Sequence, residues 1–353
     1  MITIGVDAHK RVHVALAVDE SGCEIGRWQG PNSPVGWRGL SEWALGFDSD
    51  RRWGIEGAWG YGRGLAQQLV TAGEAVFEVN ARWTALGRRS ARRLGKTDRL
   101  DARAIALLVR QEASTLPPVF PEDHTALLDL LCTEREGALA EATRLRNQIH
   151  ALLLHLDPEY QACLPSLKSQ AGLAVLETYA APGDSPLQQA RAATVRRLAQ
   201  RLRLALTQAE ELANRIGDSA AADFSPLTRL CGVSLLTAGT LAGILGPGHR
   251  FATDAQLAAY AGVAPLEASS AGHVRHRLNR GGNRRLNAIL YRIALTQARH
   301  SVEARAYLDR RVAEGKTRRE AIRALKRFII RAIWRLWQEC QPINNTTFAE
   351  NSA

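Results

Sequence analysis

The sequence of 353 residues has little of what marks a secreted, zinc-binding or membrane-spanning protein. Its five cysteines are scattered and form no Cys-x-x-Cys pair, which fits neither a zinc site nor a disulfide framework. It has no run of about 18 apolar residues, so we expect no transmembrane helix. The opening MITIGVDAHK lacks a basic leader followed by an apolar stretch, so we expect no signal peptide. These absences favour a cytoplasmic protein with reduced thiols and no membrane partner.

Acidic residues are scarce in two segments of a chain whose net charge is positive. Eight Lys and Arg lie between Arg82 and Arg103, and Asp98 and Asp101 are the only acids there. From Ala268 to Val302 the chain has seven Arg, three His and no acid. The formal net charge is +11, and arginine, whose planar fork matches phosphate, outnumbers lysine. The expected partner is nucleic acid, with an anionic membrane surface as the weaker alternative.

The N-terminal third alternates between strand and helix patterns. Residues 2–18 predict two β-branched strands around a polar turn, and residues 19–30 a turn and a third strand. Fourth and fifth strands are expected within 51–59 and 74–80, with a helical pattern between them. This order predicts an α/β domain over residues 1–115.

From about residue 122 the pattern becomes helical. Two heptad-like apolar stripes predict long helices within a middle region at 122–220, and only Arg135 interrupts the first stripe. The helices are expected to form an antiparallel hairpin or to pack against another subunit. A helical C-terminal domain is expected over 225–338, followed by a disordered tail at 341–353.

Four carboxylates are placed where they could meet. Asp7 ends the first predicted strand, Glu56 ends the fourth, and Asp98 and Asp101 begin a helix on one face. The ends of parallel strands share one sheet edge, and gathered carboxylates raise one another's pKa unless a cation is present. A pair of Mg²⁺ ions would suit such oxygen ligands and could position a phosphate. The alternatives are a turn residue at Asp7, a strand-end charge at Glu56, and a helix cap at Thr97 or Asp98.

Two basic clusters are candidates for phosphate contacts. The first precedes the paired aspartates, and the second alternates with glycine, which allows close backbone approach. The first cluster comprises Arg88, Arg89, Arg92, Arg93 and Lys96, and the second Arg275, Arg277, Arg280, Arg284 and Arg285.

Three motifs in this order, GVDAHK, IEGAWGYGRGLAQQL and KTDRLDARAIA, resemble the DEDD transposases of the insertion-sequence family numbered one hundred and ten. The resemblance extends from Ile4 to about Trp337. It implies a RuvC-like N-terminal domain on a ribonuclease-H-type fold. It also implies metal-binding roles for the residues that match the family's acids, which are Asp7, Glu56, Asp98 and Asp101.

A second resemblance to this family lies in GVAPLEASSAGHVRHRLNRGGNRRLN. Gly262, Pro265, Gly282 and Asn283 match a Gly-x-x-Pro and a later Gly-Asn element in the family's C-terminal transposase domain. Spacing from the proline favours Ser270 as the family's nucleophilic serine, with Ser269 as the alternative. The family usually has Ser-Gly there, whereas this chain has an alanine between serine and glycine.

The resemblance implies a reaction and its partners. The serine would attack a DNA phosphate beside Mg²⁺, giving a covalent 5′-phosphoserine link, and an element-encoded bridge RNA would pair with target and donor DNA. Active sites would be composite, in a homodimer or homotetramer. Two rival readings are a metal-dependent resolvase or nuclease that uses water, and a non-catalytic scaffold that binds nucleic acid.

Overall fold

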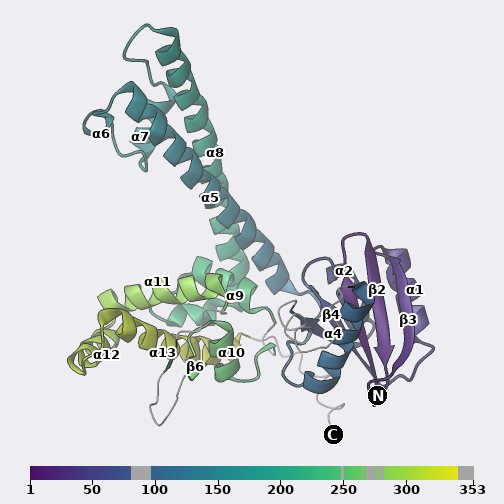
Figure 1. Cartoon of the computed structure of the whole chain (residues 1–353). Coiled ribbons are helices and arrows are strands. Elements are labelled where there is room, and N and C mark those ends of the chain that lie inside the picture. Colours follow the sequence, from purple (N-terminus) through teal and green to yellow (C-terminus); the bar gives the residue numbers. More distant parts are fainter. Residues whose placement is uncertain (81–96, 248–249, 265, 268–275, 278–281, 341–353) are drawn as a thin grey trace. The chain divides into compact units, whose positions relative to one another are not determined.

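The computed structural model describes residues 1–80, 97–247, 250–264, 266–267, 276–277 and 282–340. The chain divides into two compact units, Met1–Asp123 and His124–Ala353, which are described separately (Figure 1). The expected tail at 341–353 lies outside the described residues.

A five-stranded mixed sheet forms the centre of the N-terminal unit. Its strands are β1 (Ile2–Ala8), β2 (Val12–Val18), β3 (Glu24–Pro31), β4 (Arg51–Glu56) and β5 (Ala75–Val79), in the spatial order β3-β2-β1-β4-β5. β2 is antiparallel to β1 and β3, whereas β4 is parallel to β1 and to β5. The five predicted strands and the mixed α/β class are therefore confirmed.

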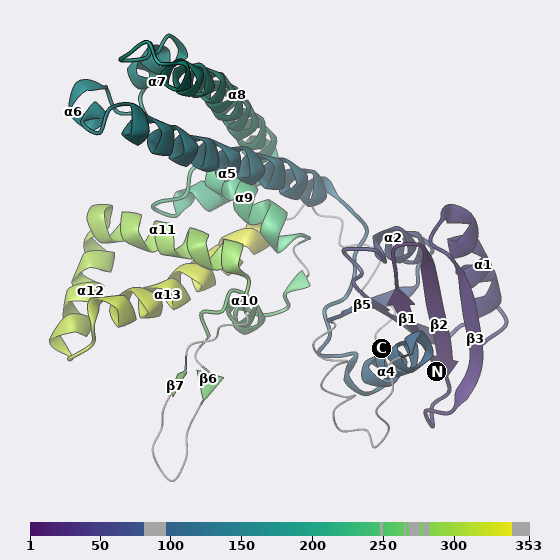
Figure 2. The ribbon, with the colours of Figure 1, turned by 45° about the horizontal axis from the view of Figure 1, so that its top comes forward.

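Side-chain alternation divides the residues of β1 and β4 between two cores. Ile4, Val6, Trp53 and Ile55 belong to the core that includes residues of α1 (Pro34–Ala44) and α2 (Arg63–Thr71). The alternate positions point to the other face of the sheet, where α4 (Asp98–Glu112) packs on Leu16, Val18 and Val79. Figure 2 shows these helices from a second direction.

Helix α1 was not among the predicted elements, although local signals for it are present. Ser33 is the N-cap and its hydroxyl accepts a hydrogen bond from the Gly36 amide, while Pro34 occupies the first turn. Both residue types are typical of these positions. The helix is short and contains two glycines, which obscure its apolar periodicity.

The C-terminal unit begins with two long helices, α5 (His124–Leu156) and α8 (Pro186–Asp223), joined through the short α6 (Tyr160–Cys163) and α7 (Gln170–Glu177). Glu141 pairs with Arg201 at 3.0 Å, and Arg135 Nε donates to the Ala209 carbonyl oxygen at 3.2 Å. Positions rise along one helix as they fall along the other, so the pair is an antiparallel hairpin. The hydrogen bond also explains why Arg135 is tolerated within the apolar stripe.

The rest of this unit is helical. Its elements are η1 (Ser225–Arg229), α9 (Leu235–Leu245), α10 (Asp254–Tyr260), α11 (Arg284–His300), α12 (Val302–Ala313) and α13 (Arg318–Glu339). Their core includes residues from both long helices, such as Leu128 and Ile216. The outer halves of the hairpin form a separate core around Ile149 and Leu202. None of the described helices is long and apolar enough to cross a lipid bilayer.

Candidate functional site

Asp7 and Glu56 lie beside each other at one edge of the N-terminal sheet. They are register partners at the carboxyl ends of the parallel strands β1 and β4. Neighbouring strands are separated by about 4.8 Å, and partners in register point to the same face. The two acids therefore project from adjacent strands on the face that α4 covers.

A pair of glycines lets α4 approach this face closely. Gly5 and Gly54 are register partners, each two residues before one of the acids. A Cβ atom at Gly5 would overlap the carbonyl oxygen of Ala102, and one at Gly54 would overlap Val109. Because both positions lack a side chain, the backbone of α4 can lie directly on the strands that carry Asp7 and Glu56.

The first turn of α4 supplies the other two predicted acids. Thr97 is the N-cap, and its hydroxyl accepts a hydrogen bond from the Leu100 amide at 3.3 Å. Of the two capping alternatives left by the sequence, the structure selects Thr97, so Asp98 does not serve as the cap. Asp101 is only 4% exposed, whereas Asp98 is exposed. Asp101 is therefore buried within the unit, whereas Asp98 is open to solvent.

Electrostatics shows that the four acids share one neighbourhood. Asp7 is 6% exposed, and this burial is the main reason that its pKa is raised. His9 counteracts the rise, while the charges of Glu56, Asp101 and Asp98 add to it. Burial and nearby negative charge both disfavour the ionised form of a carboxyl group. A bound cation would reverse this balance and hold Asp7 as a carboxylate.

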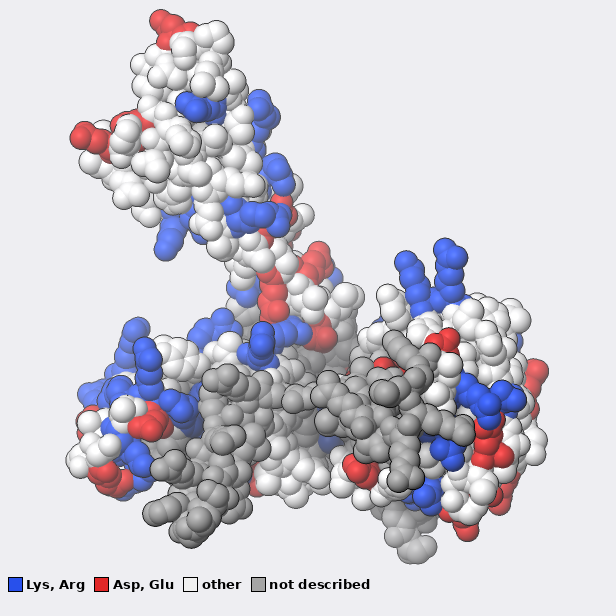
Figure 3. All heavy atoms as spheres, in the orientation of Figure 1, with Lys and Arg blue, Asp and Glu red and all other residues white. Residues whose placement is uncertain are grey.

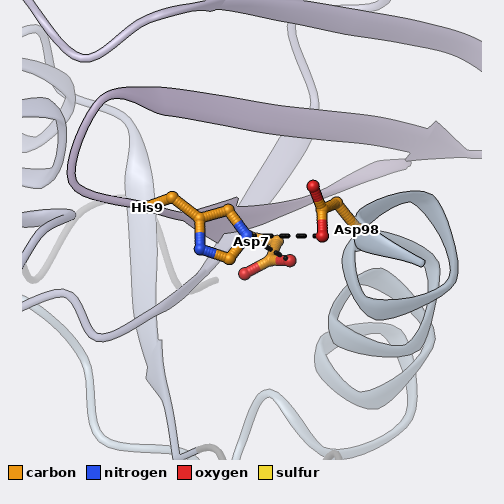
Figure 4. A group of neighbouring side chains, drawn as sticks. All are labelled: Asp7, His9 and Asp98. Carbon is orange, nitrogen blue, oxygen red and sulfur yellow. Dashed lines mark hydrogen bonds and ion pairs between the residues drawn. The ribbon is translucent and has the colours of Figure 1, made fainter. Parts of the chain in front are cut away.

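His9 also belongs to this site, although it was not predicted. Its Nε2 atom lies 3.1 Å from Asp7 Oδ2 and 3.5 Å from Asp98 Oδ1 (Figure 4). The signal in the sequence was the spacing GVDAHK, which places a histidine two residues after the acid that ends β1. The imidazole reaches the acids only because the chain turns back after Ala8 into β2, which residue spacing alone does not reveal.

The donor set fits a divalent metal ion. Asp7, His9 and Asp98 each offer one ligand atom, and these three atoms lie within 4.8 Å of one another. This spacing is expected of groups that share an ion. Carboxylate oxygens suit hard divalent cations, and imidazole nitrogen suits borderline ones. Together with the raised pKa of Asp7, this makes the carboxyl edge of β1 and β4 the candidate metal centre.

The candidate serines Ser269 and Ser270 lie outside the described residues, as do most of the predicted phosphate contacts. Those contacts are Arg88, Arg89, Arg92, Arg93, Lys96, Arg275 and Arg280. The backbones on either side of the serines are described. β6 (Leu266–Glu267) pairs antiparallel with β7 (His276–Arg277), so the strand containing Arg277 faces the one that leads into the serines.

Contacts between α10 and α11 close the base of this serine-bearing segment, residues 262–283. A Cβ atom at Gly282 would overlap the backbone of Gly262, so these two family-matching glycines allow the two ends to touch. The amide of Asn283 donates to the Tyr260 carbonyl oxygen at 2.7 Å, and its side chain donates to the Tyr260 hydroxyl at 2.8 Å. Asn283 also caps α11 through its hydrogen bond with the Leu286 amide. The family-matching residues thus have a local structural role.

Two of the predicted phosphate contacts are described with their side chains. Arg284 is exposed at the start of α11. Arg285 instead pairs with Asp129 at 2.8 Å and Glu136 at 3.1 Å, both on α5. Two carboxylates within the same unit therefore already surround its charge. Figure 3 shows further Lys and Arg side chains over α11 and α12, where Arg292, Arg299 and Arg305 are exposed.

Comparison with known proteins gives two matches to family models. Residues 4–158 match a model of DEDD type described as a transposase, and residues 225–309 match one described as the transposase IS116/IS110/IS902 family. The first match contains all four acids, and the second contains both candidate serines.

Three curated relatives are insertion-element proteins. The IS110 uncharacterized 43.6 kDa protein of Streptomyces coelicolor is 30% identical, over 66% of this chain and 68% of the relative. The IS116 uncharacterized 44.8 kDa protein of Streptomyces clavuligerus is 23% identical over 98% of both chains. The IS900 uncharacterized 42 kDa protein of Mycobacterium paratuberculosis is 24% identical over 95% of both.

Proposed function

Because the chain belongs to the IS110 family of DEDD transposases, we propose that it cuts and rejoins DNA by metal-dependent attack of a serine on phosphate. The observation that carries the proposal is the convergence of four acids at one sheet edge, where the pKa of Asp7 is raised. Burial raises the pKa of Asp7, and the charges of Glu56, Asp101 and Asp98 add to the rise, so a bound cation would stabilise the ionised form of Asp7. The mixed sheet that holds them supports a RuvC-like domain of ribonuclease-H type.

In this proposal Asp7, Glu56, Asp98 and Asp101 hold Mg²⁺. The bound ion would polarise the scissile phosphate and offset its negative charge. The chain contributes the placement of the ligands, because β1, β4 and α4 fix them before DNA arrives. Burial of Asp7 and Asp101 also keeps water from solvating these carboxylates, so the site favours a cation strongly.

The proposed nucleophile is the hydroxyl of Ser270, with Ser269 as the alternative. A new bond forms between the serine oxygen and phosphorus, while the bond from phosphorus to the 3′-oxygen of the neighbouring nucleotide breaks. The serine proton is lost and the departing 3′-oxygen gains a proton, so a 5′-phosphoserine link and a 3′-hydroxyl result. A 3′-hydroxyl from another strand can then attack the link and restore both serine and phosphodiester.

The arginines would bind the DNA backbone. Arg88, Arg89, Arg92, Arg93 and Lys96 would guide phosphate to the acids, and Arg275, Arg277, Arg280 and Arg284 would guide it to the serine. Arg285 is the weakest member of the original set, since Asp129 and Glu136 already pair with it. We further propose a bridge RNA that reads sequence by base pairing, and composite active sites in a homodimer or homotetramer assembled through the α5–α8 hairpin.

A covalent-adduct assay tests the proposal. The chain is expressed with its own flanking element, so that any guide RNA is present, then given Mg²⁺ and labelled DNA carrying the element junction. After denaturation in detergent, we expect labelled DNA attached to the protein. The adduct should disappear in Ser270→Ala and persist in Ser269→Ala.

The other outcomes are equally informative. Loss of the adduct only in Ser269→Ala would move the nucleophile by one position. Free cleaved DNA without an adduct, produced equally by both variants, would contradict the serine mechanism and favour a nuclease that uses water. No cleavage of any kind with the acids intact would contradict the proposed function.

A further inference from the structure

Two aromatic side chains are exposed immediately beside the acidic site. The segment that follows Glu56, residues 57–62, reads GAWGYG, and in it Trp59 is 42% and Tyr61 58% exposed. The other tryptophans described in the N-terminal unit belong to the apolar core or pack against it. Single exposed apolar residues are common, but two exposed rings within three residues, directly after the strand that ends in Glu56, indicate an interaction surface.

Hydrogen bonds hold this segment in place. The amides of Gly60 and Gly62 both donate to the Gly57 carbonyl oxygen, at 2.8 and 3.1 Å. Asn32 Nδ2 donates to the Tyr61 carbonyl oxygen at 3.0 Å, while Asn32 Oδ1 accepts from Trp37 Nε1 at 2.9 Å. The backbone that carries the exposed rings is therefore fixed to the folded unit before any ligand binds, which lowers the entropic cost of binding.

The same asparagine joins the aromatic segment to the turn that carries His9. Asn32 Nδ2 lies 3.3 Å from the His9 carbonyl oxygen, within hydrogen-bond reach. Lys10 and Arg11 follow in this turn and are both exposed. Within the described part of the chain, neither has an ion-pair partner. Two exposed rings and two exposed cationic side chains therefore border the edge where Asp7 and Glu56 lie.

We propose that Trp59 and Tyr61 stack on an unpaired nucleobase of the DNA strand whose phosphate lies at the acidic site, with Lys10 and Arg11 contacting the adjoining phosphates. Aromatic side chains bind bases by stacking, and grooves for single strands combine such rings with positive charge. Paired bases within a duplex are already stacked on both sides, so the gain is largest for a base that has left the stack. This inference rests on the proposed function, because that function brings the DNA strand to the acids.

The test measures binding without cleavage, so it does not depend on the proposed reaction. The full chain is titrated in EDTA with DNA that has one unpaired 2-aminopurine at the junction, and with the continuous duplex. Stacking on Trp59 should quench the fluorescence of the unpaired base. Trp59→Ala should abolish the quenching and weaken binding of this DNA by about 5- to 100-fold, with Tyr61→Ala similar. Trp59→Phe should restore most of the affinity.

Controls separate stacking from charge and from misfolding. Leu45→Ala removes an apolar side chain of the same unit that is 69% exposed, and it should leave binding unchanged. The salt dependence of binding should stay unchanged in Trp59→Ala but become shallower in Lys10→Ala, because only lysine releases counterions from DNA. Equal affinity of Trp59→Ala and wild type for the unpaired DNA would overturn the inference. Tighter binding of the matching RNA than of DNA would overturn the assignment of the occupant.

The adduct assay and the 2-aminopurine assay together distinguish failure of the proposed function from failure of the stacking inference. If no covalent adduct forms but the 2-aminopurine signal depends on Trp59, base stacking on Trp59 and Tyr61 is supported and the serine mechanism is contradicted. If a Trp59→Ala, Tyr61→Ala double variant forms adducts at the wild-type rate and binds the unpaired DNA with unchanged affinity, the serine reaction is supported. The proposed base stacking is then contradicted.

Discussion

In the N-terminal unit the candidate acids stand on two strands and a helix, whereas in the C-terminal unit the candidate serines lie in a segment between two short paired strands. Asp7, Glu56 and Asp101 are positioned by parallel register and by the docking of α4. For the serines, the described anchors are the contact of Gly262 with Gly282 and the hydrogen bonds of Asn283.

If the proposed reaction is correct, this difference shows how its two parts would be divided between the two units. Strands and helices hold side chains precisely, which would suit coordination of a metal ion by the acids. In the proposed reaction the serine would attack and later release a DNA strand, and the closed base would hold the two ends of its segment together. If these two kinds of support are independent, a substitution that disturbs one should leave the other unchanged.

The largest effect is expected from the acids. Asp7→Asn removes one charge from the buried centre and should lower strand cleavage by about 10³-fold, because metal stabilisation of the phosphate is worth several kcal/mol. Cleavage is measured on junction DNA under single-turnover conditions. Asp48→Asn, which changes an exposed acid before β4 at the other end of the sheet, is the matched control. Equal activity of Asp7→Asn and wild type would remove the acids from the mechanism.

The next effect concerns the base of the serine-bearing segment. A Cβ atom at Gly282 would overlap the backbone of Gly262, so Gly282→Ala should force the two ends apart. A shift of about 1 Å in a reacting group can cost about 10²-fold in rate. We expect a loss of this order in adduct formation, with unchanged divalent metal affinity in calorimetry. Loss of metal affinity in this variant would show that the two sites are not independent.

A corresponding substitution in the N-terminal unit should act on stability. Gly5→Ala would place a Cβ atom against the Ala102 carbonyl oxygen and push α4 from the sheet. Overpacking of this kind costs about 1–3 kcal/mol in the free energy of unfolding. Gly39→Ala is the control, since its Cβ meets only an ordinary contact with Trp28. Denaturant unfolding checks both, and an undisturbed Gly5→Ala protein would contradict the close approach of α4.

The smallest effect is on the pH dependence of stability. The pKa of Asp7 is raised in the folded protein, so the metal-free protein binds this proton more tightly when folded. Its contribution to stability is complete below the ordinary carboxyl value of 3.8 and is lost as pH rises through the raised pKa. Thermal unfolding in EDTA between pH 4 and 8 should show a shallower decline for Asp7→Asn than for wild type. If thermal stability declined with pH equally steeply in both proteins, Asp7 would not be the group whose raised pKa makes stability depend on pH.

Local patterns predicted much of the fold and the acids. Alternating apolar residues gave the five strands, and the Thr97 cap with Asp98 and Asp101 marked the start of α4. The two apolar stripes likewise indicated the long helices. These features depend on neighbours within one or two turns of chain, which a sequence displays directly.

Other features depend on residues that are distant in sequence. His9 reaches Asp98 only through the packing of α4, and Arg285 meets Asp129 and Glu136 across about 150 positions. Phe328 on α13 lies among apolar residues at helical spacing, yet it is 51% exposed and packs edge-on against Tyr307. Helical periodicity shows which face of a helix points inward. It does not show how much of that face the neighbouring elements cover.

Calorimetric titration of the full chain with Mn²⁺ and Mg²⁺ tests most directly whether Asp7, Glu56, Asp98 and Asp101 form a divalent metal site. We predict binding to wild type and to Asp48→Asn. The affinity should fall by at least about tenfold in each of Asp7→Asn, Glu56→Gln, Asp98→Asn and Asp101→Asn. Affinities equal to wild type in all four variants would contradict the account, because the acids would then be gathered for another reason.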